Sequence, residues 1–155
     1  MPITFEQFEL LLPLASMWAE QQEEIILRKG EPLNDAQLQD ARALNIRYPE
    51  KIRLLSVNNI PQPDDPILKA AADMTQLISP STIGLTLRYG IFIHSDCWGQ
   101  RRLVVHELVH TSQYERLGGF FPFLRQYLFE CLTIGYPEAP LEQEAIIKTE
   151  ELLNY

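Results

Sequence analysis

The sequence predicts a single α+β domain that is mostly helical, with a small β-hairpin or sheet directly before one buried helix. Helical apolar periodicity covers both ends of the chain, and a stretch rich in β-branched and aromatic residues near the middle favours strands. No internal repeat or low-complexity segment divides the 155 residues. We therefore expect one domain over residues 1–155, with N-terminal helices over 1–50 and a core over 80–150.

The first helix is defined by signals at both of its ends. Thr4 and Gln7 have the spacing of a capping box, so the helix is expected to begin after Thr4. Gly30 follows its last basic residue and is expected to close it. Pro13 removes a backbone donor inside this helix, which predicts a kink or a break near Leu12.

Helix and strand are expected to alternate through the middle of the chain. Asn34 or Asp35 can cap a second helix over residues 36–46. Residues 52–60 favour a strand, and a loop rich in Pro and Asp separates it from a third helix over 66–78.

The core is expected to begin with a hairpin over residues 81–96, with Gly90 at the turn. A strong helical pattern then begins at Gln100 and stops at the glycine pair 118–119. Two further helical patterns complete the chain, over residues 122–134 and 140–153.

Composition and charge argue against several classes of protein. A net charge of −8 with scattered basic residues argues against a nucleic-acid partner. No run approaches the roughly 18 apolar residues of a membrane span, and Glu6 and Glu9 lie where a signal peptide carries basic residues. We expect a cytoplasmic protein without a membrane partner, in which Cys97 and Cys131 are free thiols. The oligomeric state is not predicted.

The helix that begins at Gln100 contains the motif H-E-x-x-H over residues 106–110. His106 and His110 are one helical turn apart, so both imidazoles lie on one face and can occupy two corners of a zinc tetrahedron. Glu107 can take a proton from a metal-bound water as a general base without being a ligand. The surrounding residues are apolar, and buried imidazoles need partners that a metal can supply.

A third ligand is expected from a downstream carboxylate. A longer variant of the motif is excluded because its Gly and His positions hold Gln113 and Arg116. In the last helix, Glu142 lies in the middle of the apolar sector, whereas Glu144 lies on the opposite side. Helical phase therefore favours Glu142, although a carboxylate at a helix start can also be stabilised by the helix dipole. The other carboxylates considered are Glu130, Glu138 and Glu144.

The combination of "HELVH", a Gly-punctuated second helix and "PLEQEA" resembles the gluzincin group of zinc metallopeptidases. More closely, residues 80–150 are similar to small bacterial zincin-like domains, including some of contractile injection system proteins. The resemblance implies a zincin-like fold with one Zn²⁺ ion on His106, His110 and Glu142. It also implies that Glu107 acts as the general base.

The resemblance has one further implication and one departure. It implies that the strand before the motif helix, at residues 91–94, pairs with an extended peptide substrate. Many gluzincins carry an Asp four residues after the ligand Glu, where it orients a zinc-bound His. Here that position holds Ile146, so the supporting residues are not identified.

Several side chains near the motif have two interpretations. Tyr114 lies on the face of His110, where its hydroxyl can donate to a developing oxyanion. Alternatively, it packs against the next helix with its hydroxyl at the surface. His94 can likewise assist an oxyanion, although a solvated position on the hairpin is favoured. The remaining expectations are Trp98 and Tyr127 in the core and a solvated acidic face formed by Glu20, Glu23 and Glu24.

We therefore expect a zinc-dependent metallopeptidase of gluzincin type, which hydrolyses peptide bonds with a zinc-bound water activated by Glu107. A peptide or protein is the expected partner. One alternative is a zincin-fold metal-binding or interaction module with little or no hydrolytic activity. Another is a helical protein in which the motif occurs by chance.

Overall fold

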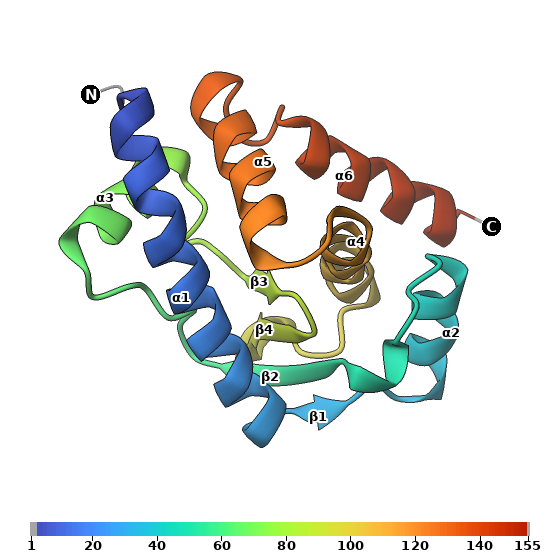
Figure 1. Cartoon of the computed structure of the whole chain (residues 1–155). Helices are drawn as coiled ribbons and strands as arrows, with labels where there is room; N and C mark the ends of the chain where they lie inside the picture. The colour runs from blue at the N-terminus through green and yellow to red at the C-terminus, as the bar shows by residue number, and fades with distance from the viewer. Residues whose placement is uncertain (1–2, 155) are drawn as a thin grey trace.

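The computed structural model describes residues 3–154, and these form a mixed β-sheet with helices on both faces (Figure 1). The mostly helical α+β prediction is confirmed. The helices are α1 (Phe5–Lys29), α2 (Asp35–Ala43), α3 (Pro66–Thr75), α4 (Arg101–Leu117), α5 (Phe120–Thr133) and α6 (Pro140–Leu153). The strands are β1 (Glu31–Pro32), β2 (Arg53–Val57), β3 (Gly84–Leu87) and β4 (Gly90–His94), and two short 3₁₀ turns are η1 (Pro49–Lys51) and η2 (Ser95–Cys97).

Helix α1 begins at the predicted capping box, in which Thr4 and Gln7 exchange hydrogen bonds. Of the kink or break predicted near Leu12, the break is wrong, because α1 continues through Pro13. Leu11 and Leu12 are buried directly before the proline, whose exposed ring points away from the core. Packing on this side therefore keeps the helix intact despite the missing donor.

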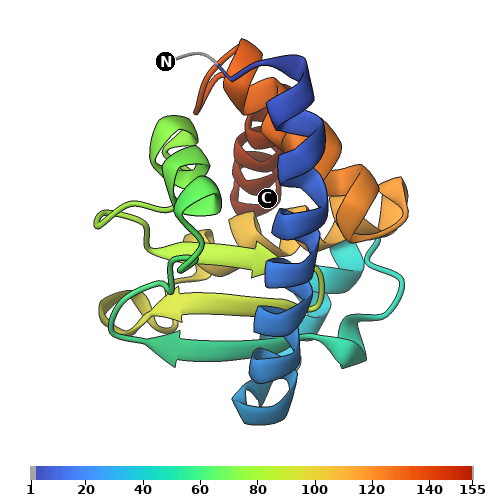
Figure 2. The same ribbon diagram turned by 60° about the vertical axis from the view of Figure 1, so that its left-hand side comes forward.

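The strands lie in the order β1-β2-β4-β3, and α1 runs across them on one face (Figure 2). Strand β4 pairs in parallel with β2 and antiparallel with β3, so it has a neighbour on each side. The expectation that residues 91–94 pair with a substrate is therefore wrong, because their backbone groups are already used. The two edge strands are β1, which has two residues, and β3, which has four.

The hairpin turn differs from its prediction. Its residues are Arg88, with a left-handed φ of 62°, and Tyr89, while Gly90 is already the first residue of β4. A Cβ at Gly90 would lie 3.0 Å from the Cβ of Ile26, so the glycine permits close packing of α1. Glu23 is also not solvated: it is buried and accepts two hydrogen bonds from the Arg88 guanidinium, at 2.7 and 2.8 Å.

Two predicted helices end earlier than their patterns suggest. Helix α2 ends at Ala43, because Asn45 adopts a left-handed φ of 63°. Helix α3 ends at Thr75, and the next residue, Gln76, has a φ of 57°. Both stops depend on single backbone conformations that apolar periodicity does not reveal.

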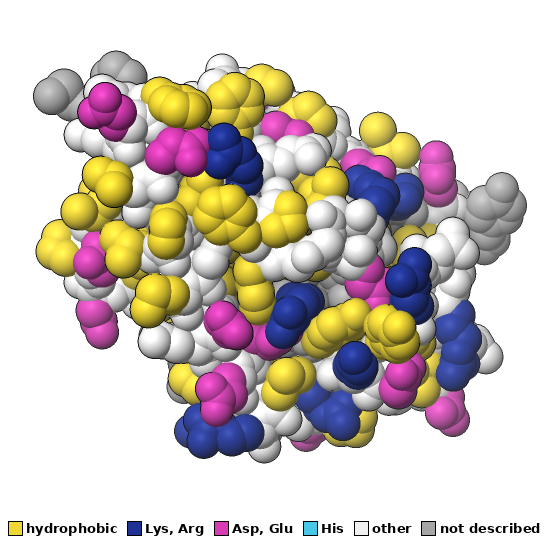
Figure 3. Space-filling model, in the orientation of Figure 1, with side chains coloured by type: hydrophobic (Ala, Val, Ile, Leu, Met, Phe, Trp, Pro, Cys, Tyr) yellow, Lys and Arg dark blue, Asp and Glu magenta, His cyan; other side chains and the backbone are white. Residues whose placement is uncertain are grey.

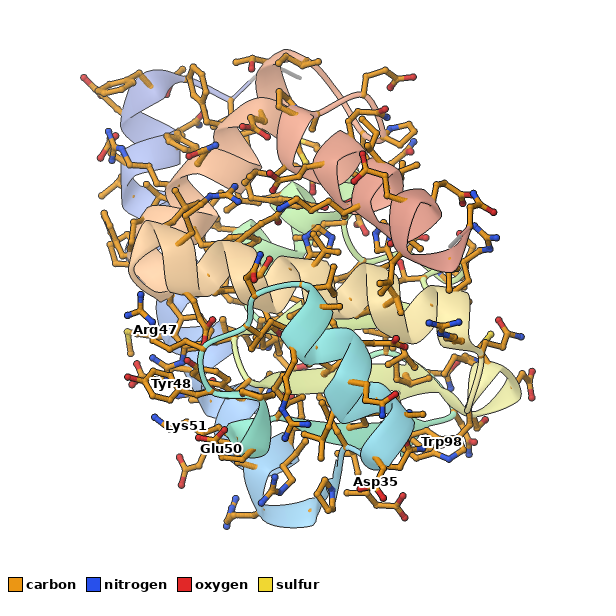
Figure 4. All side chains as sticks on the ribbon, turned by 90° about the vertical axis from the view of Figure 1, so that its right-hand side faces the viewer. Asp35, Arg47, Tyr48, Glu50, Lys51 and Trp98 are labelled. Carbon is orange, nitrogen blue, oxygen red and sulfur yellow. The ribbon has the colours of Figure 1, made fainter. Side chains whose placement is uncertain are left out.

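Alternate residues of β4 pack on opposite faces of the sheet. Phe92 joins the apolar cluster of α1 and α5, whereas Ile91 and Ile93 join that of α4 and α2. Tyr127 lies in the first cluster, as predicted. Trp98 is not a core residue: it is 41% exposed in the loop before α4, at the margin of the molecule (Figure 4).

The surface carries few strong features. Apolar, acidic and basic side chains are interspersed on the face drawn in Figure 3, where no histidine of the described residues is visible. Cys97 and Cys131 are free thiols, as expected. Among residues 3–154, no helix combines the length and apolar character needed to cross a membrane.

Candidate metal centre

Helices α4 and α6 bring His106, His110 and Glu142 together. His106 Nε2 lies 2.7 Å from Glu142 Oε1, and His110 Nε2 lies 3.1 Å from Glu142 Oε2. One donor atom from each residue lies within 4.8 Å of the others, so the three residues could hold a metal ion. Glu142 is the carboxylate that helical phase favoured in the sequence.

The three donors fit a metal ion with small adjustments. A tetrahedral ion with bonds of about 2.1 Å separates its donor atoms by roughly 3.4 Å. The two nitrogen–oxygen separations of 2.7 and 3.1 Å are shorter than this by less than about 1 Å. Side-chain movements of that size leave both helices in place.

Glu142 is a buried carboxylate with only 2% of its surface exposed. Burial raises the pKa of its carboxyl, but hydrogen bonds with His106 and His110 outweigh burial and hold that pKa well below its ordinary value. The hydroxyl of Tyr127 also donates to Glu142 Oε2 at 2.9 Å. The carboxylate is therefore charged and fixed in position.

His110 is shifted in the opposite direction. Burial lowers the pKa of its imidazole, but the hydrogen bond with Glu142 and the charge of Glu107 outweigh burial and raise the pKa to about 9. In the metal-free protein a proton on His110 therefore partly balances the carboxylates. A metal ion would replace that proton.

Gln113 supports this histidine, and the sequence interpretation missed it. His110 Nδ1 donates to Gln113 Oε1 at 2.8 Å, which leaves Nε2 of the neutral ring free for a metal. Gln113 is completely buried, and its Nε2 donates to the backbone oxygen of Leu141 and to Glu144 Oε1. Its position three residues after His110, on the same helical face, was the available signal.

Ile146 occupies the position where many gluzincins carry an Asp, and its apolar side chain cannot accept a hydrogen bond from a histidine. Ile146 is 37% exposed, whereas its neighbour Ala145 is buried against α4. The hydrogen-bond acceptor for His110 is Gln113 Oε1 instead.

The other candidate carboxylates are used elsewhere. Glu144 is partly exposed, pairs with Arg116 and accepts from Gln113 Nε2, and it is not one of the three clustered donors. Glu130 is buried and accepts the backbone N–H of Leu141 at 2.8 Å, so it caps the start of α6. This cap fixes the turn of helix that carries Glu142. Glu138 is exposed.

Glu107 is held beside the three residues by strand β3. It is 6% exposed, and its Oε1 accepts a hydrogen bond from the Thr86 hydroxyl at 2.8 Å. A Cβ at Gly84 would lie 3.1 Å from Oε2 of Glu107, so the glycine leaves room for this carboxylate. Glu107, His106, His110 and Glu142 line the same cavity.

The expected hydroxyl donor, Tyr114, is already used. It is buried rather than at the surface, stacks on Phe123, and donates to the backbone oxygen of Thr86 at 3.2 Å. The hydroxyl of Tyr136, between α5 and α6, lies 3.4 Å from Glu142 Oε1 instead. Burial and the charge of Glu142 raise the pKa of Tyr136, so its hydroxyl keeps its proton.

His94 is remote from this arrangement. Its Nδ1 accepts the backbone N–H of Asp96 at the end of β4, and it does not line the cavity. His94 therefore caps the turn after β4 and is not placed to assist an oxyanion at the three clustered residues.

His106, Glu107, His110 and Glu142 form one site, in which His106 is half-buried and the other three are buried. Side chains of β3, α4 and α5 support it. No protein-family model, curated protein or solved structure matches this chain. A function for the chain therefore has to follow from the geometry and chemistry of the site.

Proposed function

We propose that the chain is a zinc-dependent metallopeptidase of gluzincin type. The observation that carries this proposal is the buried Glu142 carboxylate, which contacts both histidines of H-E-x-x-H in a cavity that also holds Glu107. Two imidazole nitrogens and one carboxylate oxygen are a frequent donor set for catalytic zinc. When bound, zinc would lower the pKa of water and polarise the carbonyl of the peptide bond.

Glu107 is the general base of the proposed reaction. Its carboxylate takes a proton from the attacking water and delivers that proton to the nitrogen of the leaving amine. Thr86 holds one carboxylate oxygen from the side of β3, while Gly84 leaves space at the other. The base is thus fixed by a strand rather than by a flexible loop.

Tyr136 is the better placed donor for the developing oxyanion. Its hydroxyl is protonated and lies at the metal end of the cavity, where it donates to Glu142 Oε1 over a long 3.4 Å, whereas the Tyr114 hydroxyl is buried and donates to the Thr86 carbonyl at 3.2 Å. A single donor aimed at a developing oxyanion contributes about 10²–10³ in rate in other hydrolases.

The edge of β3 can align an extended peptide. The backbone N–H of His94 donates to the backbone oxygen of Ile83, and by alternation the backbone groups of Gly84 and Thr86 face away from β4. The Thr86 oxygen already accepts from the Tyr114 hydroxyl, so Gly84 is the better placed to pair with a peptide. Because Gly84 lies beside the Glu107 carboxylate, a peptide paired there would lie near the proposed base. This edge replaces the strand at residues 91–94 as the proposed substrate-binding strand.

The proposal is tested by measuring bound metal and peptide cleavage in the purified protein. Glu107→Gln should retain zinc and lose cleavage by at least about 10²-fold, because it removes the base but no ligand. Glu151→Gln, on the exposed face of α6, is the matched control and should leave both unchanged. Unchanged cleavage in Glu107→Gln would contradict the mechanism, and zinc binding without cleavage of any peptide would favour the metal-binding module.

A further inference from the structure

The cavity at the metal centre continues well beyond it. Its volume is about 710 Å³, within the roughly 300–1,000 Å³ range of small-molecule sites. From the metal centre it passes the outer edge of β3 into the space between α1, α3 and α5, which Figure 2 shows above the sheet. We call this part the apolar chamber; its walls on α1 and α3 include Leu11, Ala15, Trp18, Leu68, Ala71 and Ala72.

Charge is confined to one end of the cavity. Among the described residues, every charged side chain that lines it comes from α4 or α6. Arg102 is one of these, and it is already paired with Glu150. The walls of the apolar chamber on α1 and α3 provide no ionisable group, so a charged substrate group placed there would lose its hydration without gaining a partner.

The openings are more polar than the chamber. Gln76, Ser81 and Gln100 line the cavity and are exposed, whereas Leu11 and Leu68 are buried. A ligand can therefore keep its polar backbone near β3 and the metal centre while an apolar group enters the chamber. Each methylene buried in this way strengthens binding about fourfold.

We infer that the substrate carries a large apolar group, of the size of a leucine, methionine or aromatic side chain, within one residue of the bond that is cut. This inference rests on the proposed function, because it takes the metal centre as the position of the scissile carbonyl. The apolar chamber selects the substrate by removing that group from water. Small and charged side chains gain nothing there.

Alkyl hydroxamates test the chamber separately from catalysis. Acetohydroxamate binds a protein-held zinc ion with almost no apolar group, and hexanohydroxamate adds four methylenes. With the zinc-loaded protein, isothermal titration should show that the longer ligand binds on the order of a hundredfold more tightly. Adipic monohydroxamate, equally long but with a terminal carboxylate, should lose that gain.

Two matched variants on α3 locate the effect. Ala72→Phe fills the chamber and should abolish the preference for hexanohydroxamate, while acetohydroxamate binds as before. Ala70→Phe, on the exposed side of the same helix, should keep the preference. If Ala72→Phe does not fold, the chain-length comparison in the unchanged protein still decides the matter.

The possible failures are distinguishable. If the protein binds zinc and acetohydroxamate but does not bind hexanohydroxamate more tightly, the apolar chamber is not a specificity site. The metal centre is not contradicted by that result. A preference for hexanohydroxamate that survives in Ala72→Phe overturns the apolar chamber as a specificity site as well. A protein that binds no zinc overturns the proposed function, and this inference with it.

Discussion

Replacing Gln113 with leucine should weaken metal binding without removing a ligand. Gln113→Leu removes the acceptor of the 2.8 Å hydrogen bond from His110 Nδ1, which orients the ring toward Glu142. Loss of such a supporting partner typically costs 10- to 100-fold in metal affinity, or about 1.4–2.7 kcal/mol. The backbone oxygen of Leu141 also loses its donor, so we expect an added loss of about 1–3 kcal/mol in the stability of the metal-free protein.

The assay is competition for zinc against a chromophoric chelator, with thermal unfolding of the metal-free protein measured in parallel. Gln21→Leu, on the exposed surface of α1, is the control and should change neither quantity. A Gln113→Leu protein that folds and binds zinc with unchanged affinity would refute the assignment of Gln113 as the residue that orients His110.

Four other predictions concern the base, the oxyanion donor and, in two cases, the proton on His110. Gly84→Ala places a Cβ 3.1 Å from the Glu107 carboxylate, so peptide cleavage should fall while zinc content stays the same; equal loss of both would point to general disruption. Tyr136→Phe should lower kcat by about 10²–10³ with little change in KM, and an unchanged kcat would exclude the hydroxyl as oxyanion donor. Because the pKa of His110 is raised to about 9, zinc must displace a proton below that pH, so apparent zinc affinity should rise up to about tenfold per pH unit between pH 6.5 and 9. The same raised pKa stabilises the metal-free fold below pH 6.5, and that contribution should be lost as the pH rises to about 9, which urea titrations at several pH values can measure.

The cluster of His106, His110 and Glu142 could be predicted because helices have a fixed period. Spacing placed His106 and His110 on one face, and the phase of the last helix placed Glu142 toward the core. Both steps use contacts within a single helix. The long-range step, that α6 packs on α4, followed only from a buried carboxylate in need of partners, and the structure shows that those partners are the two histidines.

The supporting residues depend on contacts that a period does not encode. Tyr136 lies in the irregular segment between α5 and α6, where no repeating pattern indicates the direction of a side chain. Glu23 looked solvated within an acidic run, but the turn between β3 and β4 brings Arg88 to it. The order of the strands could not be predicted for the same reason. Strands β2 and β4 pair in parallel although more than thirty residues separate them, and this pairing leaves β3 as one of the two edge strands.

The central claim is that His106, His110 and Glu142 bind one zinc ion. The most direct test is the zinc content of the purified protein by mass spectrometry, compared with Glu142→Ala and with Glu151→Ala, an exposed position on the same helix, as the control. We predict about one zinc per chain in the unchanged protein and in Glu151→Ala, and a loss of zinc in Glu142→Ala. Equal zinc content in Glu142→Ala and the unchanged protein, or no zinc in either after loading, would contradict the account.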